Sequence, residues 1–320
     1  MAAQDSPVFR AGTNTVLVPV TVTDRSGRFV QSLTAEQFEI SEDGTRRAVA
    51  QFSAGRVPVS LGILLDISGA MAPDEETRVT DGVRWAHTRR ALEVLLTRLD
   101  AADEVSFAVF NHQVAVAPWT QDHPGILREF DGLRPGGGNA LLDAVQLVSP
   151  TFELARHQRK VLLLISDGND TNSSSGQGAT PSDPRSLDGA PPGHEPMTLM
   201  ADSRETLRQR RISTAKSILR RLDVMLYAIG IGTRKGMPVD TVLLEGLTRD
   251  SGGYAEPLRD PSAISAAAAR IWDDLQSQYL LAFEPGSVDG RYHEIRVRTK
   301  DRQLRVRARA GYMASSATPK

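Results

Sequence analysis

The sequence contains no cysteine among its 320 residues. This excludes disulfides, thiolate metal sites and cysteine nucleophiles. It also lacks a charge excess, because 38 Lys and Arg residues are balanced by 39 Asp and Glu residues and the formal net charge is −1. Bulk charge therefore gives no reason to expect nucleic acid as a partner. No apolar run approaches the roughly 18 residues of a transmembrane helix, so we expect no membrane span.

The remaining composition, 40% hydrophobic and 24% charged, is that of an ordinary globular protein. A chain of this length is expected to bury a large core and to form more than one domain. The first residues, Met1-Ala2-Ala3-Gln4-Asp5, contain no basic or apolar signal segment. We interpret them as a mature end from which a signal peptide was removed, and we predict an extracytoplasmic protein, secreted or periplasmic.

The stretch Leu61–Ala70, Leu-Gly-Ile-Leu-Leu-Asp-Ile-Ser-Gly-Ala, organises the rest of the chain. Its apolar half predicts a strand that is buried on both faces. The strand should end at Asp66, because Ser68 and Gly69 are typical of a turn. A carboxylate and a hydroxyl group would then lie at the carboxyl end of a core strand, which is where ligands bind in open α/β sheets.

Around this stretch, residues 57–278 alternate apolar strands with helices, which predicts a doubly wound α/β domain with a parallel sheet. Within it, residues 171–202 are rich in Ser, Gly, Pro and Asp, and we expect a mobile insertion. Residues 8–56 and 279–313 alternate apolar and polar positions between turns. They predict an antiparallel β module in which both termini build one β layer beside the α/β domain.

Several shorter patterns refine this expectation. Glu42-Asp-Gly44 predicts a hairpin turn whose return strand is Arg47–Phe52. Helices are predicted over residues 140–154 and 204–222. The second of these is basic, which is typical of a solvated helix face.

Three segments together resemble the von Willebrand factor A-type domain: Asp66-Ile-Ser68-Gly-Ala70, Gly138-Asn139-Ala-Leu-Leu-Asp143 and Ile165-Ser-Asp167-Gly168. In that family an Asp-x-Ser-x-Ser motif, a later Thr and a later Asp build a metal-ion-dependent adhesion site. Flanking segments extend the resemblance to the VWFA-related proteins of acidobacteria, among them Val20-Thr-Val-Thr-Asp24, Leu33-Thr-Ala-Glu-Gln-Phe38 and Ala310-Gly-Tyr312. The resemblance implies a Rossmann-like fold and a role in binding other macromolecules through Mg²⁺, not catalysis.

Carried over residue by residue, the resemblance implies four metal ligands and a rim that would meet a partner. The ligands are Asp66, Ser68, Asn139 and Asp167, and the rim is Ala70, Gly138 and Asp170. Ala70 stands where the family has its second Ser, so one oxygen is lost, while Asn139 replaces Thr and keeps an amide oxygen. Mg²⁺ is the expected cation, with Mn²⁺ and Ca²⁺ as alternatives. The expected partner is an extracellular or cell-envelope protein that supplies an acidic side chain.

Other interpretations stay open beside this one. In one of them, Asp66 only caps its turn and no metal binds. The chain is then a metal-independent scaffold that binds through its β module. An enzymatic role is not expected, because Ser68 occupies the position where strand-end Asp phosphatases place a second Asp. Ser68 also lacks the Gly-x-Ser-x-Gly elbow of a hydrolase nucleophile. The run Gly136-Gly-Gly138 is not followed by Gly-Lys-Ser/Thr, which excludes a P-loop.

Overall fold

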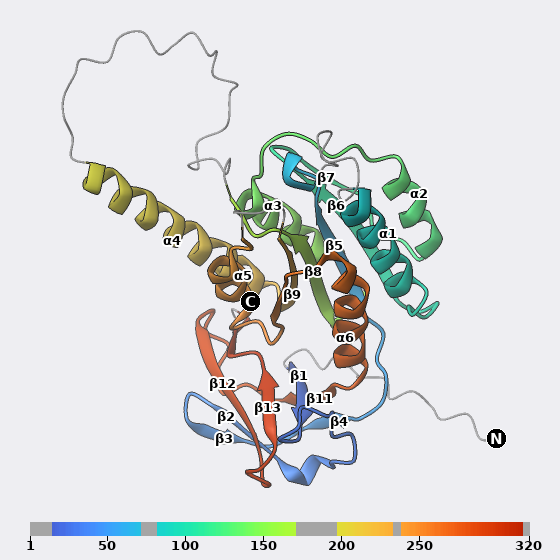
Figure 1. The fold of residues 1–320 in the computed structure, drawn as a ribbon. Helices are drawn as coiled ribbons and strands as arrows, with labels where there is room; N and C mark the ends of the chain where they lie inside the picture. Colours follow the sequence, from blue (N-terminus) through green and yellow to red (C-terminus); the bar gives the residue numbers. More distant parts are fainter. Residues whose placement is uncertain (1–14, 72–81, 171–196, 233–237, 316–320) are drawn as a thin grey trace.

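The computed structural model describes residues 15–71, 82–170, 197–232 and 238–315. Figure 1 shows an α/β domain (residues 60–276) above a β sandwich formed by residues 15–53 and 279–315. The predicted processing site near Met1 and most of the predicted insertion lie outside the described residues. None of the described helices is long and apolar enough to cross a membrane.

A six-stranded sheet in the order β10-β9-β8-β5-β6-β7 forms the centre of the α/β domain. Its strands are β5 (Ser60–Asp66), β6 (Glu104–Phe110), β7 (Val114–Val116), β8 (Lys160–Ser166), β9 (Val224–Ile231) and β10 (Ala255–Leu258). All neighbours are parallel except β6 and β7. The central strands β5, β8 and β9 are almost wholly buried, as expected for strands covered on both faces. The predicted doubly wound α/β class is therefore confirmed.

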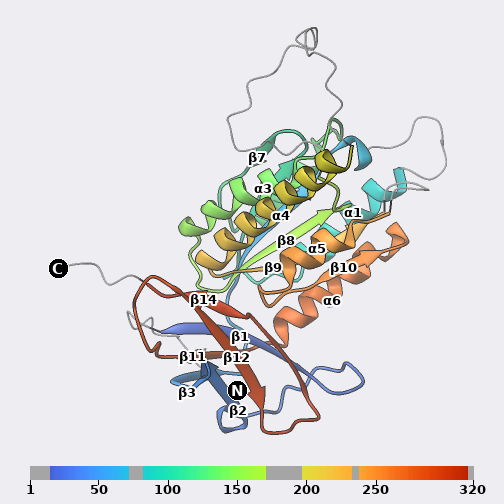
Figure 2. The same cartoon turned by 90° about the vertical axis from the view of Figure 1, so that its left-hand side faces the viewer.

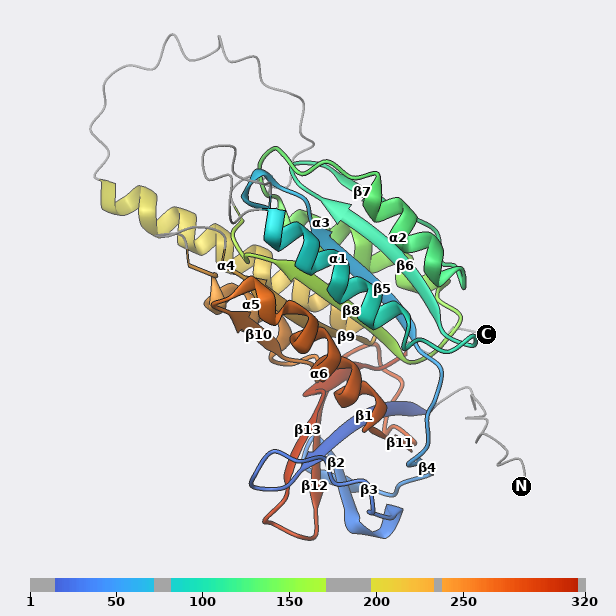
Figure 3. The same cartoon turned by 45° about the vertical axis from the view of Figure 1, so that its right-hand side comes forward.

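Helices cover both faces of this sheet. One face carries α1 (Gly82–Leu96), α2 (His123–Asp131) and α6 (Ile264–Gln276), as Figure 3 shows. The other carries α3 (Leu141–Val148), α4 (Met197–Arg221) and α5 (Thr241–Thr248), seen in Figure 2. Because side chains alternate along a strand, Ile63 and Leu65 enter the core under α1 and α6, while Leu64 enters the core under α3 and α4.

The β sandwich consists of two four-stranded sheets with the orders β13-β1-β11-β4 and β14-β12-β2-β3. Its strands are β1 (Val16–Thr23), β2 (Phe38–Glu42), β3 (Thr45–Arg47), β4 (Gln51–Ser53), β11 (Tyr279–Phe283), β12 (Tyr292–Thr299), β13 (Arg305–Ala308) and β14 (Gly311–Met313). All pairs are antiparallel. The two sheets share one core, to which Val18, Ile40 and Tyr279 contribute.

Three local predictions are wrong in ways that have physical causes. The termini form two packed sheets instead of one layer, because the apolar faces of the strands bury each other. Residues Arg47–Phe52 are not one return strand: β3 pairs with β2, and β4 pairs with β11. The helix predicted over 140–154 is α-helical only to Val148 and continues as a 3₁₀ segment, since Pro150 cannot donate to the helix ladder.

The boundary predicted for the insertion is also wrong, because residues 197–202 already belong to α4. The division of the chain into domains at 8–56, 57–278 and 279–313 stays a prediction. What the structure shows is the strand pairing: β1 pairs with both β11 and β13, so the first described strand is held between two strands from the other end of the chain.

A histidine in the β sandwich gives a first testable prediction. His293 Nδ1 lies 2.7 Å from Asp43 Oδ2, and Nε2 lies 3.0 Å from Asp289 Oδ1. Asp289 and Asp43 raise the pKa of His293 above its ordinary 6.5. The stabilisation is therefore complete below pH 6.5 and is lost as the pH rises through the raised pKa. Because both carboxylates are partly exposed, we expect less than about 1 kcal/mol.

Urea denaturation of the wild type and of His293→Gln at acidic and alkaline pH measures this effect. The wild type should exceed the variant in stability more at acidic than at alkaline pH. A difference that is independent of pH would contradict the prediction.

Candidate functional site

The candidate site lies where β5 and β8 end. Asp66 is the last residue of β5, and Asp167 directly follows β8. These strands are parallel neighbours, with Leu65 opposite Ile165. From here the chain continues to β6 on one side of β5 and later reaches β8 on the other, so this edge is the topological switch point of the sheet. Asp66 is 0% and Asp167 1% exposed, so both carboxyl groups are buried.

The amide of Asn139 joins the two carboxyl groups. Its Nδ2 donates to Asp66 Oδ2 at 2.6 Å and lies 3.4 Å from Asp167 Oδ1. Asp66 Oδ2 also accepts from the hydroxyl of Ser166 at 2.7 Å, and its Oδ1 accepts from the backbone N–H of Ser68 at 2.8 Å. The structure thus brings the predicted ligands Asp66, Asn139 and Asp167 together at one point.

Two loops position Asn139. The N–H of Gly136 donates to the carbonyl of Ile67 at 2.7 Å, and the N–H of Gly69 donates to the carbonyl of Gly137 at 2.8 Å. Gly137 has a φ of +83°, and a Cβ atom there would lie 2.5 Å from His112 Nδ1. Glycine is therefore required for the loop to cross close to the strand ends and deliver Asn139.

The hydroxyl group of Ser68 differs from its neighbours. Ser68 is 1% exposed, and within the described residues its Oγ has no hydrogen-bond partner. Leaving a buried hydroxyl unsatisfied costs on the order of 1–3 kcal/mol. Such a group is a natural contact for a cation or a bound water.

Electrostatics at the site disfavour two charged carboxylates. Burial raises the pKa of Asp66 to about 6, and the charge of Asp167 acts in the same direction. The nearby Ser68 hydroxyl, the Ser166 hydroxyl and the Ser68 backbone N–H oppose this effect without cancelling it. A cation would favour the charged form and relieve the repulsion.

The predicted rim residues lie around this point but differ in accessibility. Ala70 and Gly138 are partly exposed. The Asp170 side chain is only 6% exposed, with Leu142 N 3.4 Å from its Oδ1 and Arg211 Nη1 4.0 Å from its Oδ2. Asp170 would therefore reach a partner only after a local rearrangement, and its role stays a prediction.

Ser166 is the site residue that the sequence analysis did not single out. Its hydroxyl donates to Asp66 and accepts from the N–H of Gly168 at 3.1 Å. The sequence feature that could have revealed Ser166 is a polar residue at the end of an apolar run. Aligning β8 with β5 in parallel register would have placed it beside Asp66.

The two carboxylates of the site can coordinate a hard cation only together with neutral oxygen atoms and water. Within the described ranges no group of three or more His, Asp or Glu side chains is placed to hold a metal ion. Two carboxylates, the Ser68 hydroxyl and an amide oxygen would leave further positions for water, which Mg²⁺ commonly retains. The unpartnered Ser68 hydroxyl and the two converging carboxyl groups fit such an ion.

Residues 61–169 match the family model described as von Willebrand factor type A domain. The chain contains a von Willebrand factor A-type domain. The matched residues include all four predicted ligands and begin inside β5. The assignment to an acidobacterial branch stays a prediction, since the match concerns only this A-type domain.

Two solved structures share the fold. A von Willebrand factor type A protein from Catenulispora acidiphila aligns with a TM-score of 0.50 and 12% identity, over 95% of this chain and 74% of that one. The PilB minor pilin from Streptococcus sanguinis aligns with a TM-score of 0.51 and 13% identity, over 70% of this chain and 62% of that one. No curated protein sequence matches the chain. At these identities the likeness shows the fold alone.

Proposed function

We propose that this is a non-enzymatic binding protein that recognises an acidic group of a partner protein at the switch-point edge of its A-type domain. A divalent cation, Mg²⁺ in the first place, would be held there by Asp66, Ser68 and Asp167. The observation that carries the proposal is the convergence of Asp66 and Asp167, from neighbouring strands, on one buried point. We place the protein outside the cytoplasm, and a minor pilin with this fold is consistent with that location.

Each side chain has a defined task in this proposal. The cation, when bound, supplies a positive centre that attracts the carboxylate of the partner. Asp66 and Asp167 provide negative charge, and Ser68 offers the hydroxyl that has no partner within the described residues. Asn139 would contribute its amide oxygen in place of the family's Thr hydroxyl. Because Ala70 provides no oxygen, one more water would remain bound than in the complete motif.

One observation favours a second candidate, a metal-independent scaffold that binds partners through its β sandwich. The Asn139 amide nitrogen faces both carboxyl groups, at 2.6 Å from Asp66 Oδ2 and 3.4 Å from Asp167 Oδ1. A donor in this place satisfies the carboxyl groups without a cation. The two candidates differ in their response to a chelator, because only the first needs a metal.

Calorimetric titration with Mg²⁺ at pH 7.5 separates them. We expect binding by the wild type and its loss in Asp66→Asn and Asp167→Asn. The matched control is Asp131→Asn, which removes an exposed carboxylate paired with Arg89 and should bind Mg²⁺ normally. Flat traces for the wild type at millimolar Mg²⁺ would overturn the metal-dependent proposal and leave the scaffold.

The replacement Ala70→Ser gives a further prediction. It restores the hydroxyl that the family has at this position, and one additional oxygen ligand should raise Mg²⁺ affinity about tenfold, or about 1.4 kcal/mol. The control Ala70→Val adds bulk without an oxygen and should not raise the affinity. If Ala70→Ser binds Mg²⁺ no better than the wild type, Ala70 does not occupy the ligand position that we assign to it.

A further inference from the structure

A second candidate site lies at the opposite end of the A-type domain. A cleft of about 370 Å³ separates the β sandwich from the strand starts, lined by Leu17 and Pro19 of β1 on one side and by Lys160 and Val161 of β8 on the other. Its position excludes any contact with Asp66, which ends β5 at the far edge of the sheet.

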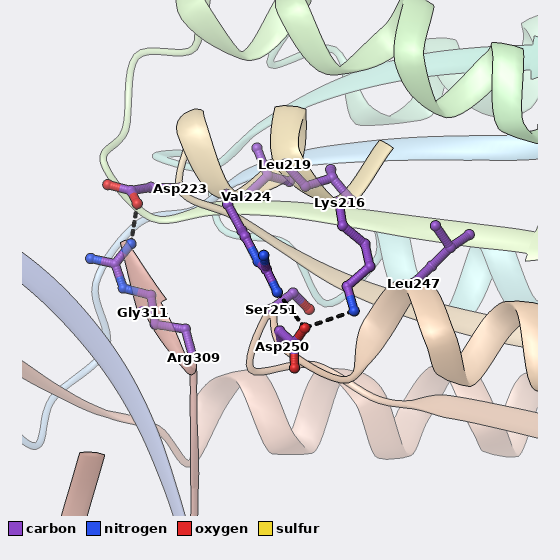
Figure 4. Close-up of a pocket in the computed structure, with 10 residues that line it drawn as sticks. Lys216, Leu219, Asp223, Val224, Leu247, Asp250, Ser251, Arg309 and Gly311 are labelled. Atoms are coloured by element: carbon purple, nitrogen blue, oxygen red, sulfur yellow. Dashed lines mark hydrogen bonds and ion pairs between the residues drawn. The ribbon is translucent and has the colours of Figure 1, made fainter. Parts of the chain in front are cut away.

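The lining of this cleft carries mostly positive charge. Five of its lining residues are Arg or Lys: Arg156, Arg159, Lys160, Arg221 and Arg309. Within the described part of the chain, the one acidic residue of the lining is Asp223, which already accepts a hydrogen bond from Arg309. Figure 4 shows Arg309 reaching across to Asp223 beside the start of β9. Among the described residues, no carboxylate lies within 4.0 Å of the charged groups of the other four cations.

Two of these cations are buried. Arg159 is 4% and Arg309 7% exposed. Arg159 donates to the carbonyl groups of Val57 and Leu275 and to Gln278 Oε1, all of them neutral acceptors. Within the described residues, Arg159 Nε and the Nε and Nη2 of Arg309 have no acceptor. Burial lowers the pKa of the Arg159 guanidinium, although the charges of Asp103 and Asp274 act in the opposite direction.

The other three cations of the lining are accessible to solvent. Arg156 and Arg221 are exposed and Lys160 is partly exposed. They can contact a ligand from the solvent side, while the buried guanidinium of Arg159 adds positive potential where water screens charge least. Several cations around one cavity suit a multivalent oxyanion better than a single carboxylate. A phosphate group carries about −1.5 to −2 at pH 7 and offers three acceptor oxygens.

We propose that the cleft between the β sandwich and the A-type domain binds a small molecule that bears phosphate groups. The ligand contacts both parts of the protein, so it fixes their relative position as well as neutralising the cleft. Its site is separate from the metal edge, and its occupancy does not depend on a divalent cation.

The test uses inorganic pyrophosphate as the probe, titrated calorimetrically into the full chain in EDTA at about 0.15 M salt, where surface charges are screened beyond about 8 Å. The wild type should bind, and the double variant Lys160→Gln/Arg221→Gln should lose at least tenfold in affinity. The control Arg298→Gln/Arg302→Gln has the same net charge, changes exposed residues of the β sandwich and should change affinity less than twofold. Asp66→Asn should bind as the wild type does, which separates this site from the metal edge.

Three results with soluble ligands would overturn the proposal. The first is absence of binding at millimolar pyrophosphate, and the second is an equal loss in both double variants, which would mean unspecific attraction. The third is equal affinity for citrate, which would remove the assignment to phosphate. Vesicles containing phosphatidic acid carry the same group on a surface and should not bind; their binding would overturn the small-molecule assignment. Thermal melting checks that both double variants fold, and pyrophosphate should raise the melting temperature of the wild type but not of Lys160→Gln/Arg221→Gln.

Discussion

Asp274→Ala should lower the free energy of unfolding by about 3–5 kcal/mol, whereas Asp273→Ala, one residue earlier on α6, should lower it by less than about 1 kcal/mol. The two side chains differ in burial, 2% against 57% exposed, and in what they contact. Asp273 forms a surface ion pair with Arg98. Asp274 lies at the junction between the A-type domain and the β sandwich.

The contacts of Asp274 explain the large effect. Its Oδ1 accepts from Thr21 of β1 at 2.9 Å and from Arg307 of β13, and its Oδ2 accepts from the hydroxyl of Tyr227 of β9. Alanine would leave all three donors without this acceptor. The Arg307 side chain is 30% exposed, so water can solvate it only in part. An uncompensated, partly buried charge is the largest share of the expected cost.

Urea denaturation of the wild type and both variants measures the two costs. The double-mutant cycle with Arg307→Met isolates the pair, and we expect a coupling energy between the two sites of about 1 kcal/mol or more. Equal losses for Asp274→Ala and Asp273→Ala would show that the junction does not depend on this carboxylate.

The second large effect concerns pH. In EDTA, the wild type should lose about 2 kcal/mol of stability relative to Asp66→Asn between pH 4.5 and pH 7.5. The pKa of Asp66 is about 6 in the folded protein against an ordinary value of 3.8. The folded chain therefore holds this proton more tightly than the unfolded chain. Its contribution is complete below pH 3.8 and is lost as the pH rises through about 6, and the full difference is about 3 kcal/mol.

Subtracting the stability of Asp66→Asn from that of the wild type at each pH cancels the contributions of the other titratable groups. Asp131→Asn serves as the control. The hydrogen bond from Arg89 lowers the pKa of this exposed carboxyl group, so its small contribution to stability increases with pH instead of decreasing. Millimolar Mg²⁺ should flatten the decline of the wild type above pH 6, since the proposed cation favours ionised Asp66. Parallel pH profiles for the wild type and Asp66→Asn would contradict the assignment of a buried, proton-retaining Asp66.

The central strands could be predicted because a strand that is buried on both faces has a continuous apolar sequence. The apolar runs that end at Asp66 and before Ser166 predict β5 and β8, and the parallel arrangement brings their carboxyl ends to one edge. The approach of Asn139 was harder to predict, because it depends on a loop held by backbone hydrogen bonds to Ile67 and Gly69. The resemblance to a known family, and not spacing, pointed to that residue.

In the β sandwich, the local sequence pattern does not predict which strands pair. Phe52 lies in a three-residue strand that pairs with Leu281 of β11, and nothing in residues 47–52 indicates that partner. The ion pair of Arg47 with Glu42 at 2.6 Å holds β3 in its hairpin, so the chain must leave that sheet before β4 begins. The distribution of strands between two sheets is set by long-range packing, which a single sequence does not display.

Because β4 and β11 are antiparallel neighbours, with Leu280 opposite Ser53, the chain enters and leaves the A-type domain through adjacent strands. A tensile force applied between Val16 and Met313 would thus act on the β sandwich. The A-type domain would not carry this force. The edge that carries Asp66 would keep its shape while the sandwich sheared. Any response of this molecule to mechanical load would begin in the short strands that join its two ends.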